Sequence, residues 1–399
     1  MQLLGGLTPQ QFLDQYWQKK PCLIRQAIPG FVSPISPDDL AGLACEDEVE
    51  SRLLLEKDGP APWFLERGPF DEVRFSQLPD SHYTLLVQQA NQLLPDVAEF
   101  LHQFQFVPNW RVDDVMISYA PLHGSVGPHL DQYDVFLLQG LGRRRWQIHS
   151  GDVRDVPRVP DTELDILAEF EAEQEWILEP GDMLYLPPNI AHYGVALEDC
   201  MTYSIGFRAP SQQELLSAWV DDVASHLPDS LRYRDPQLRV PLHPGEIDAT
   251  AIATVQQLLR QALTEDEAIT HWFGRFITEP AAHRPDMSLS SPMTALAVQQ
   301  RFAASGTLYR SETSRLAFIR DSHAVQVYAD GMEFSLPVTL AEFAARICDA
   351  RVVTREQLCP WQADETAWEL LASLYNLGVL WFEGDEESDD DEEADAFYD

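Results

Sequence analysis

The chain has 399 residues, 45% hydrophobic and 23% charged, which is long enough for two or three domains that each bury a core. Its formal net charge of −38 disfavours free nucleic acid as a partner and favours a basic protein or peptide, although acidity by itself also gives solubility. The five cysteines are scattered and include no Cys-x-x-Cys pair, which argues against a zinc ribbon and a disulfide framework. The sequence has no apolar run of about eighteen residues and no basic, apolar start, which argues against a membrane span and a signal peptide. We therefore expect a cytoplasmic protein.

The N-terminal elements are predicted to be a short helix and a short strand. Thr8 and Pro9 supply an N-cap and a first-turn proline, and apolar residues follow at helical spacing. Cys22, Leu23 and Ile24 predict a strand. Residues 30–114 then alternate short helices and strands.

A strand-rich region is predicted from Val115 to about Phe207. Short apolar runs are separated there by glycine and proline turns, as in a barrel or jelly roll. Within it, residues 156–170 predict a polar loop and a short acidic helix.

Two motifs in this region contain candidate metal ligands. His129 and Asp131 are two residues apart, so in a strand they point to the same face. His192 follows a Gly-Asp turn and a short apolar run that ends in two prolines. Two neutral imidazoles and one carboxylate suit Fe(II) and leave three coordination positions open. His-x-Asp alone is a common pattern, and the pairing with His192 is what makes the prediction specific.

Residues 143–148, with the sequence Arg-Arg-Arg-Trp-Gln-Ile, predict a strand with an inward arginine. Alternation puts Arg144, Trp146 and Ile148 on one face, and Trp and Ile mark the buried face. An inward guanidinium needs an anion, and its planar fork suits a carboxylate. Two alternatives stay open: the charge reaches the rim, or it pairs with an internal Asp or Glu.

The strand that begins near Asp114 offers a second candidate site. Asp114, Met116 and Ser118 share one of its faces, and Tyr133 shares a face with the candidate metal ligands. If these faces point inward, they supply a carboxylate for a guanidinium, an apolar wall and a ring for stacking, and Ser204 could close the pocket. The alternative is that Asp114 only caps a turn.

The pattern changes at Ala209 and Pro210. Ser211 and Glu214 form a capping box before an amphipathic helix, and further helices are predicted at 248–263 and from Glu265. Their apolar faces are explained equally by a homodimer interface and by packing within the chain.

The last third predicts helices with a small antiparallel sheet, which is typical of a winged-helix-like domain. It lacks a basic face, so we expect no direct DNA binding. Residues 383–399 hold eleven acids and no base and account for 11 of the 38 net negative charges. The tail from Asp385 to Asp399 is predicted to be disordered. The expected strands are 316–319, 325–328 and 378–382, with a hairpin turn at 330–331, and the expected helices are 339–348, 354–358 and 364–376.

Seven stretches together resemble one known family: 12–26 (FLDQYWQKKPCLIRQ), 113–119 (DDVMISY), 127–139 (GPHLDQYDVFLLQ), 142–146 (GRRRW), 181–192, 203–210 (YSIGFRAP) and 272–280 (WFGRFITEP). They resemble the JmjC group of Fe(II)- and 2-oxoglutarate-dependent oxygenases. More closely, they resemble the bacterial ribosomal oxygenases, cupin-superfamily proteins that hydroxylate an arginine of large-ribosomal-subunit protein sixteen. The resemblance spans roughly residues 7 to 280 and is weaker beyond.

The resemblance implies an α+β protein with four parts. Residues 1–209 would form a JmjC double-stranded β-helix, which is a cupin jelly roll. Residues 210–280 would form a helical dimerisation region, and residues 281–383 a winged-helix-like domain. The acidic tail, 384–399, is not a feature of the family pattern.

The resemblance also implies the roles of the site residues. His129, Asp131 and His192 would bind Fe(II), and Arg144 would anchor the distal carboxylate of 2-oxoglutarate. We assign Ser118 to 2-oxoglutarate as well, with oxygen as the second cosubstrate and no side chain as general base. The residues expected to bind the substrate arginine are Asp114, Met116, Tyr133 and Ser204.

The expected partners are a basic ribosomal protein and a second copy of the chain. The alternatives are a JmjC-type demethylase, a hydroxylase of another protein, and a non-catalytic cupin used as a binding module. An intact ligand set together with Arg144 disfavours the last of these.

Overall fold

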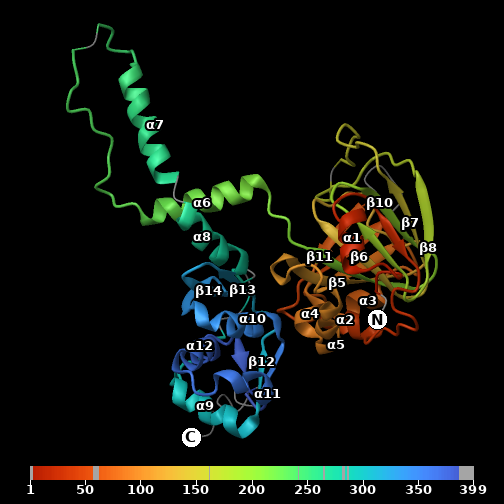
Figure 1. Cartoon of the computed structure of the whole chain (residues 1–399). Coiled ribbons are helices and arrows are strands. Elements are labelled where there is room, and N and C mark those ends of the chain that lie inside the picture. The colour runs from red at the N-terminus through yellow and green to blue at the C-terminus, as the bar shows by residue number, and fades with distance from the viewer. Residues whose placement is uncertain are drawn as a thin grey trace, which may run out of the picture. The chain divides into compact units, whose positions relative to one another are not determined.

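The computed structural model of the protein describes residues 3–56, 63–160, 162–240, 242–263, 266–280, 284 and 287–385. The chain divides into two compact units, Met1–Ala209 and Pro210–Asp399 (Figure 1). Residues 386–399, which make up most of the predicted acidic tail, lie outside the described residues. Among the described residues, no helix is long and apolar enough to cross a membrane.

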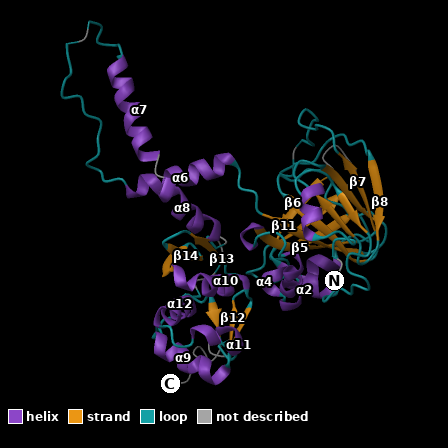
Figure 2. Ribbon diagram, in the orientation of Figure 1, coloured by secondary structure: helices purple, strands orange, loops and turns teal. Residues whose placement is uncertain are grey.

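The first unit is a jelly roll of two antiparallel sheets, as the strand-rich pattern predicts (Figure 2). Within the described residues, the larger sheet has eight strands and the smaller has three. The larger sheet has the order β1 (Cys22–Ile24), β9 (Met183–Leu186), β6 (Asp134–Leu141), β11 (Cys200–Phe207), β5 (Val112–Ala120), β4 (Tyr83–Val87), β2 (Ser51–Glu56) and β3 (Trp63–Arg67). The smaller sheet has the order β10 (Ala191–Ala196), β7 (Arg144–His149) and β8 (Gln174–Leu178).

Alternation along the strands of the larger sheet separates its two faces. Leu53, Leu85 and Ile117 belong to the main core, together with helix residues such as Phe12 and Leu40. The helices of this unit are α1 (Pro9–Gln15), α2 (Pro37–Leu43), α3 (Glu72–Ser76), α4 (Ala90–Leu93) and α5 (Pro95–Leu101). Because successive side chains of a strand point to opposite faces, the strand residues next to these core residues face the interior of the jelly roll.

The predicted start of the first helix is confirmed. The Thr8 side chain accepts a hydrogen bond from Gln11 N, the Gln11 side chain accepts one from Thr8 N, and Pro9 occupies the first turn. This reciprocal pairing satisfies two backbone donors that the helix itself leaves without partners.

The short acidic helix expected within residues 156–170 is wrong. The described residues of this segment contain no helix, and an isolated bridge pairs Arg158 with Leu167. Leu167 N also donates to Pro128 O at 2.8 Å, and Leu167 is buried among apolar residues of neighbouring loops. Tertiary hydrogen bonds and burial therefore replace the local i to i−4 bonds that acidic composition alone suggested.

The second unit begins with three helices, α6 (Gln212–His226), α7 (Ala249–Leu263) and α8 (Asp266–Thr278). The predicted capping box at the start of α6 is confirmed, with Ser211 accepting from Glu214 N at 3.1 Å. No side chain described in α7 is buried. The apolar face of α7 is therefore not covered by the described part of the chain.

The rest of the second unit packs helices and two small sheets around one core. The sheets, each three-stranded within the described residues, have the orders β16-β12-β17 and β13-β14-β15, and β14 and β15 form the hairpin predicted at Asp330 and Gly331. Asp385, which we placed in the tail, belongs to the fold, because its carboxylate pairs with Arg301 and accepts from Phe382 N at 2.7 Å. The remaining elements are α9 (Ala295–Ser305), β12 (Thr307–Arg310), β13 (Leu316–Arg320), β14 (Ala324–Ala329), β15 (Met332–Pro337), α10 (Ala341–Asp349), β16 (Val352–Thr354), α11 (Arg355–Leu358), α12 (Glu365–Asn376) and β17 (Leu380–Trp381).

Candidate metal centre and its cavity

A cavity of about 440 Å³ lies in the first unit and is lined by strands of both sheets. Every residue that the sequence analysis assigned to a site lines it: Asp114, Met116, Ser118, His129, Asp131, Tyr133, Arg144, His192 and Ser204. The structure therefore brings the candidate metal ligands, the candidate cosubstrate residues and the candidate substrate residues into one space.

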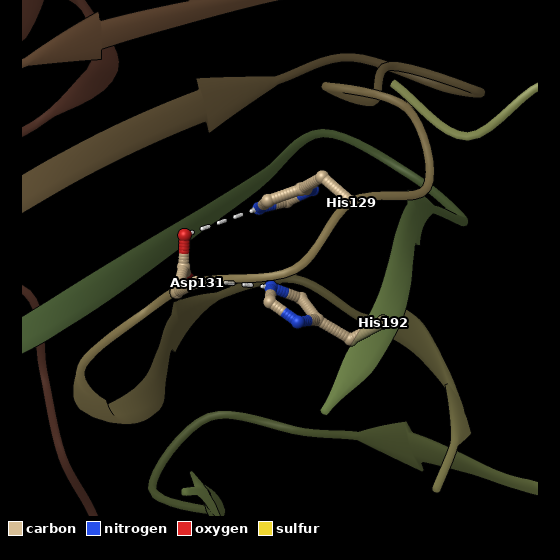
Figure 3. A group of neighbouring side chains, drawn as sticks. All are labelled: His129, Asp131 and His192. Carbon is tan, nitrogen blue, oxygen red and sulfur yellow. Dashed lines mark ion pairs between the residues drawn. The ribbon is translucent and has the colours of Figure 1, made fainter. Parts of the chain in front are cut away.

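His129, Asp131 and His192 converge in this cavity (Figure 3). Their ligand atoms all lie within 4.8 Å of one another. Asp131 Oδ2 is 3.6 Å from His192 Nε2, and Asp131 Oδ1 is 4.0 Å from His129 Nε2. Two ring nitrogens and a carboxylate can therefore reach a single ion placed between them.

The backbone sets which ring nitrogen of each histidine faces the carboxylate. His129 Nδ1 lies 3.0 Å from Gly127 O and His192 Nδ1 lies 2.9 Å from Ile190 O. A carbonyl can only accept, so each Nδ1 carries the proton and each Nε2 presents a lone pair to the site. Burial and the nearby His129 lower the pKa of His192, which keeps this ring neutral and able to bind a metal.

The regular strand expected around His129 and Asp131 is reduced to one bridge. His129 pairs with His192 alone, and β6 begins only at Asp134. Asn189 N donates to Asp131 O at 2.8 Å and fixes the turn that carries the carboxylate. His192 itself lies in β10, just beyond the predicted strand and prolines.

Arg144 faces inward, as the alternation predicts. Arg144, Trp146 and Ile148 are buried, and the side chain of Arg144 is within reach of Ser118 Oγ (3.5 Å) and Gly194 O (3.3 Å). A Cβ at Gly194 would approach Arg144 Nε to 2.8 Å, so only glycine leaves room for the guanidinium here.

Arg144 has no counter-ion within the described part of the chain. No ion pair with it occurs there, and its Nε is buried without a hydrogen-bond partner. Both alternatives, a charge that reaches the rim and a pair with an internal Asp or Glu, are therefore wrong for the described residues. Because an isolated buried charge is costly, this guanidinium is suited to bind an anion from outside the chain.

Asp114 lines the cavity and also holds a turn. Its Oδ2 accepts a hydrogen bond from Gln89 N at 3.0 Å. The alternative role of Asp114, as the cap of a turn, therefore applies to one of its two carboxylate oxygens. Its Oδ1 faces Gly206, where an added Cβ would lie 3.6 Å from Oδ1 and 3.9 Å from the Tyr133 ring. Burial raises the pKa of Asp114 to about 6, against the hydrogen bond from Gln89. Burial and the charge of Asp131 also raise the pKa of Tyr133.

Sequence reasoning missed several polar residues of the cavity, among them Arg52 and Gln88. Arg52 stands at the start of the apolar run Leu53, Leu54 and Leu55 in β2. A run of consecutive leucines has no period of two, so the sequence did not show which face Arg52 occupies.

Comparison with known proteins identifies both units. The model of the JmjC domain family matches residues 99–215, and that of the ROXA-like winged helix matches residues 257–381. The second match confirms the fold class predicted for the C-terminal domain.

Two relatives and a solved structure match most of the chain. It is 35% identical over 378 residues to the ribosomal protein uL16 3-hydroxylase of Escherichia coli, covering 94% of this chain and 97% of the relative. It is 32% identical to the probable ribosomal oxygenase of Haemophilus influenzae, covering 82% and 81%. The solved structure of YcfD, a ribosomal oxygenase from Escherichia coli, in complex with cobalt and 2-oxoglutarate matches with a TM-score of 0.80 at 34% identity, covering 95% of this chain and 99% of that one.

Proposed function

Because the chain belongs to the JmjC-type ribosomal oxygenases of the cupin superfamily, we propose that it is an Fe(II)- and 2-oxoglutarate-dependent hydroxylase of an arginine side chain in ribosomal protein uL16. The observation that carries this proposal is one cavity that holds two imidazoles and a carboxylate within 4.8 Å, together with a buried arginine that lacks a counter-ion in the described chain.

The metal ligands in the proposal are His129, Asp131 and His192. The donor set fits Fe(II), because neutral imidazoles with a single carboxylate suit this ion and leave positions open for a cosubstrate and oxygen. When bound, the iron would supply the oxidative decarboxylation of 2-oxoglutarate to succinate and carbon dioxide and the transfer of one oxygen atom to a C–H bond. The protein contributes the fixed placement of the ligands and of the reacting groups.

The distal carboxylate of 2-oxoglutarate would be held by Arg144 and Ser118. Arg144 Nη1 and Ser118 Oγ lie together on the cavity wall, 3.5 Å apart, and the ring of Trp146 lies under the guanidinium at 5.1 Å. Leu137 and Trp146 also line the cavity and belong to one apolar cluster. A guanidinium that has no counter-ion in the described chain and stands in an apolar wall is the arrangement that a small dicarboxylate requires.

The substrate guanidinium would bind at the other end of the cavity. Asp114 offers a carboxylate, Tyr133 a ring and Met116 an apolar wall, and Ser204 lies beside Met116 in the neighbouring strand. A charged, planar side chain can hydrogen-bond the carboxylate and stack on the ring at the same time. The net charge of −38 would speed the approach of a basic ribosomal protein.

The test is incubation of the iron-loaded protein with 2-oxoglutarate and a uL16 peptide. We expect the peptide to gain one oxygen atom at the arginine, with succinate in equal amount, and a peptide with lysine in place of that arginine to lose most of this activity. Formaldehyde release from a methylated peptide, without hydroxylation, would favour the demethylase alternative. Absence of any 2-oxoglutarate turnover would favour a binding module.

A second copy of the chain is the partner proposed for the helical region. Leu216, Val220, Ile252, Val255 and Leu259, on α6 and α7, are all more than 40% exposed, although they form the apolar faces of their helices. Burying such residues against a second copy removes apolar surface from water. Light scattering should give the mass of a dimer, and Val255→Glu with Leu259→Glu should shift it to that of a monomer. A monomeric mass for the unmodified protein would contradict this proposal.

The cytoplasm is the proposed location. All five cysteines are free thiols, and Cys22, Cys200 and Cys348 are buried, so no disulfide requires an oxidising compartment. A ribosomal protein substrate would also be met there.

A further inference from the structure

The side chain of Arg52 lines the cavity, where its positive charge acts to lower the pKa of Asp114. In β2, Leu53 and Leu55 enter the main core, whereas Arg52 and Leu54 line the cavity. No residue in the described ranges forms a hydrogen bond or an ion pair with the Arg52 side chain, and its Nε is buried. A buried N–H donor that has left bulk water without gaining an acceptor is costly, so the position of the Arg52 Nε calls for a ligand.

Gln88 offers the complementary group beside it. Arg52 pairs in register with Leu86 of β4, and Gln88 follows two residues later on the same face. Diagonal neighbours of this kind in adjacent strands lie roughly 7–8 Å apart, within reach of long side chains. Oε1 of Gln88 is buried and has no hydrogen-bond partner among the described residues. The two side chains thus present one unused donor group and one unused acceptor to the same space.

This pair lies away from the proposed cosubstrate end of the cavity. Leu86 is paired with Arg52 on one side and with Ser118 on the other. Arg52 is therefore two strands from Ser118, roughly 10 Å at about 4.8 Å per strand. Ser118 contacts Arg144, so a ligand of Arg52 would lie two strands away from the proposed 2-oxoglutarate site.

We propose that Arg52 and Gln88 bind the main chain of the protein substrate next to the modified residue. The Arg52 guanidinium donates to a substrate carbonyl, and Gln88 Oε1 accepts from the N–H of the same substrate residue. In an extended peptide these two groups of one residue point to the same side. This inference rests on the proposed function and extends it, since it names how the enzyme holds the backbone of its substrate.

The charges around the cavity favour a carbonyl over an acidic side chain as the ligand. Asp113, Asp114, Asp131 and Asp165 also line it, so a substrate carboxylate would be repelled. The proposed substrate is basic and would bring few carboxylates. Main-chain carbonyls are the acceptors that every peptide carries.

Arg52→Met tests the donor, and the direction in which it changes the KM for the peptide distinguishes a hydrogen bond from an effect of charge alone. It should raise the KM for the uL16 peptide about tenfold or more, because a hydrogen bond to a charged group is lost. The KM for 2-oxoglutarate should change much less. If Arg52 acted only through its charge, its removal would make the cavity more acidic and would lower the KM for a basic peptide. Gln88→Leu should also raise the KM for the peptide.

Arg154→Met is the matched control. It changes the net charge equally, but Arg154 is 87% exposed, pairs with Asp152 and is not part of the cavity lining. It should leave both KM values unchanged. Thermal unfolding of each variant checks that the fold is kept.

A modified peptide identifies the main chain as the ligand. An ester in place of the amide beside the target residue weakens the carbonyl as an acceptor and should raise the KM of the unmodified enzyme several-fold, but not that of Arg52→Met. The inference is overturned if Arg52→Met has an equal or lower KM for the peptide, or if its effect disappears when one acidic side chain of the peptide is removed. If the unmodified enzyme does not hydroxylate the peptide at all, the proposed function fails instead.

Discussion

His129 and His192 face each other across a single antiparallel bridge, in which His129 N donates to His192 O at 3.0 Å and His192 N donates to His129 O at 2.8 Å. Their rings lie 4.2 Å apart, and each Nδ1 is tied to a backbone carbonyl. The two imidazoles are therefore placed by main-chain hydrogen bonds and do not depend on Asp131 for their position.

Asp131→Ala should consequently remove metal binding without loss of the fold. Changes to groups that only orient metal ligands cost about 10–100-fold in affinity, so loss of a ligand should exceed that. The measurement is a calorimetric titration with Mn(II) under conditions where the unmodified protein binds one ion per chain. Asp165→Ala is the control, because Asp165 lines the same cavity but pairs with Arg158. Equal Mn(II) affinity in Asp131→Ala and the unmodified protein would contradict the assignment of the ligands.

Arg144→Met should raise the KM for 2-oxoglutarate about 30-fold or more. Truncating one partner of a buried charge pair costs about 2–5 kcal/mol, and each 1.4 kcal/mol corresponds to about a factor of ten. Succinate formation at varied 2-oxoglutarate gives the constant. Arg145→Met is the matched control, since Arg145 lies on the opposite face of β7 and is 38% exposed. A similar KM in both variants would rule out Arg144 as the anchor.

The residues that sequence predicted best are those whose strands carry clear markers of a buried face. In β7, Trp146 and Ile148 identify the inward face and therefore Arg144. In β2 three consecutive leucines hide the alternation, so Arg52 was missed. The helix expected near Leu167 failed because distant backbone partners, such as Pro128 O, were not visible in the local pattern. Local propensity yields to such tertiary contacts.

Binding of the peptide should strengthen as pH rises from 5 to 7. Burial raises the pKa of Asp114 to about 6, so below that pH the group is protonated and carries no charge to pair with a guanidinium. The KM for the peptide should therefore fall as pH increases, with an inflection near pH 6. Asp114→Asn should have a high KM without this inflection, whereas the KM for 2-oxoglutarate should change little in it. An identical pH profile for Asp114→Asn would exclude Asp114 as the group that titrates.

The strand that follows the metal ligands begins at a fully buried carboxylate, Asp134. Tyr185 Oη donates to Asp134 Oδ1 at 2.6 Å, Gln18 Nε2 donates to Oδ2 at 2.9 Å, and Arg111 Nη2 lies 3.3 Å from Oδ2. Gln18 N in turn donates to Tyr185 Oη at 2.8 Å. These contacts join the N-terminal segment, β6 and β9 three residues after Asp131, so they support the turn that carries this ligand.

Asp134→Ala should lower the free energy of unfolding by about 3–5 kcal/mol, because it leaves the Arg111 charge without its buried partner. Tyr185→Phe removes one hydrogen bond to the carboxylate and should cost about 1.5–3 kcal/mol, which keeps the test informative if Asp134→Ala does not fold. Tyr233→Phe, at an exposed tyrosine, is the control and should be neutral. Urea unfolding followed by circular dichroism measures all three. Because the network holds the turn of Asp131, Tyr185→Phe should also weaken Mn(II) binding. Stability equal to that of the unmodified protein in both Asp134→Ala and Tyr185→Phe would show that these contacts do not support the site.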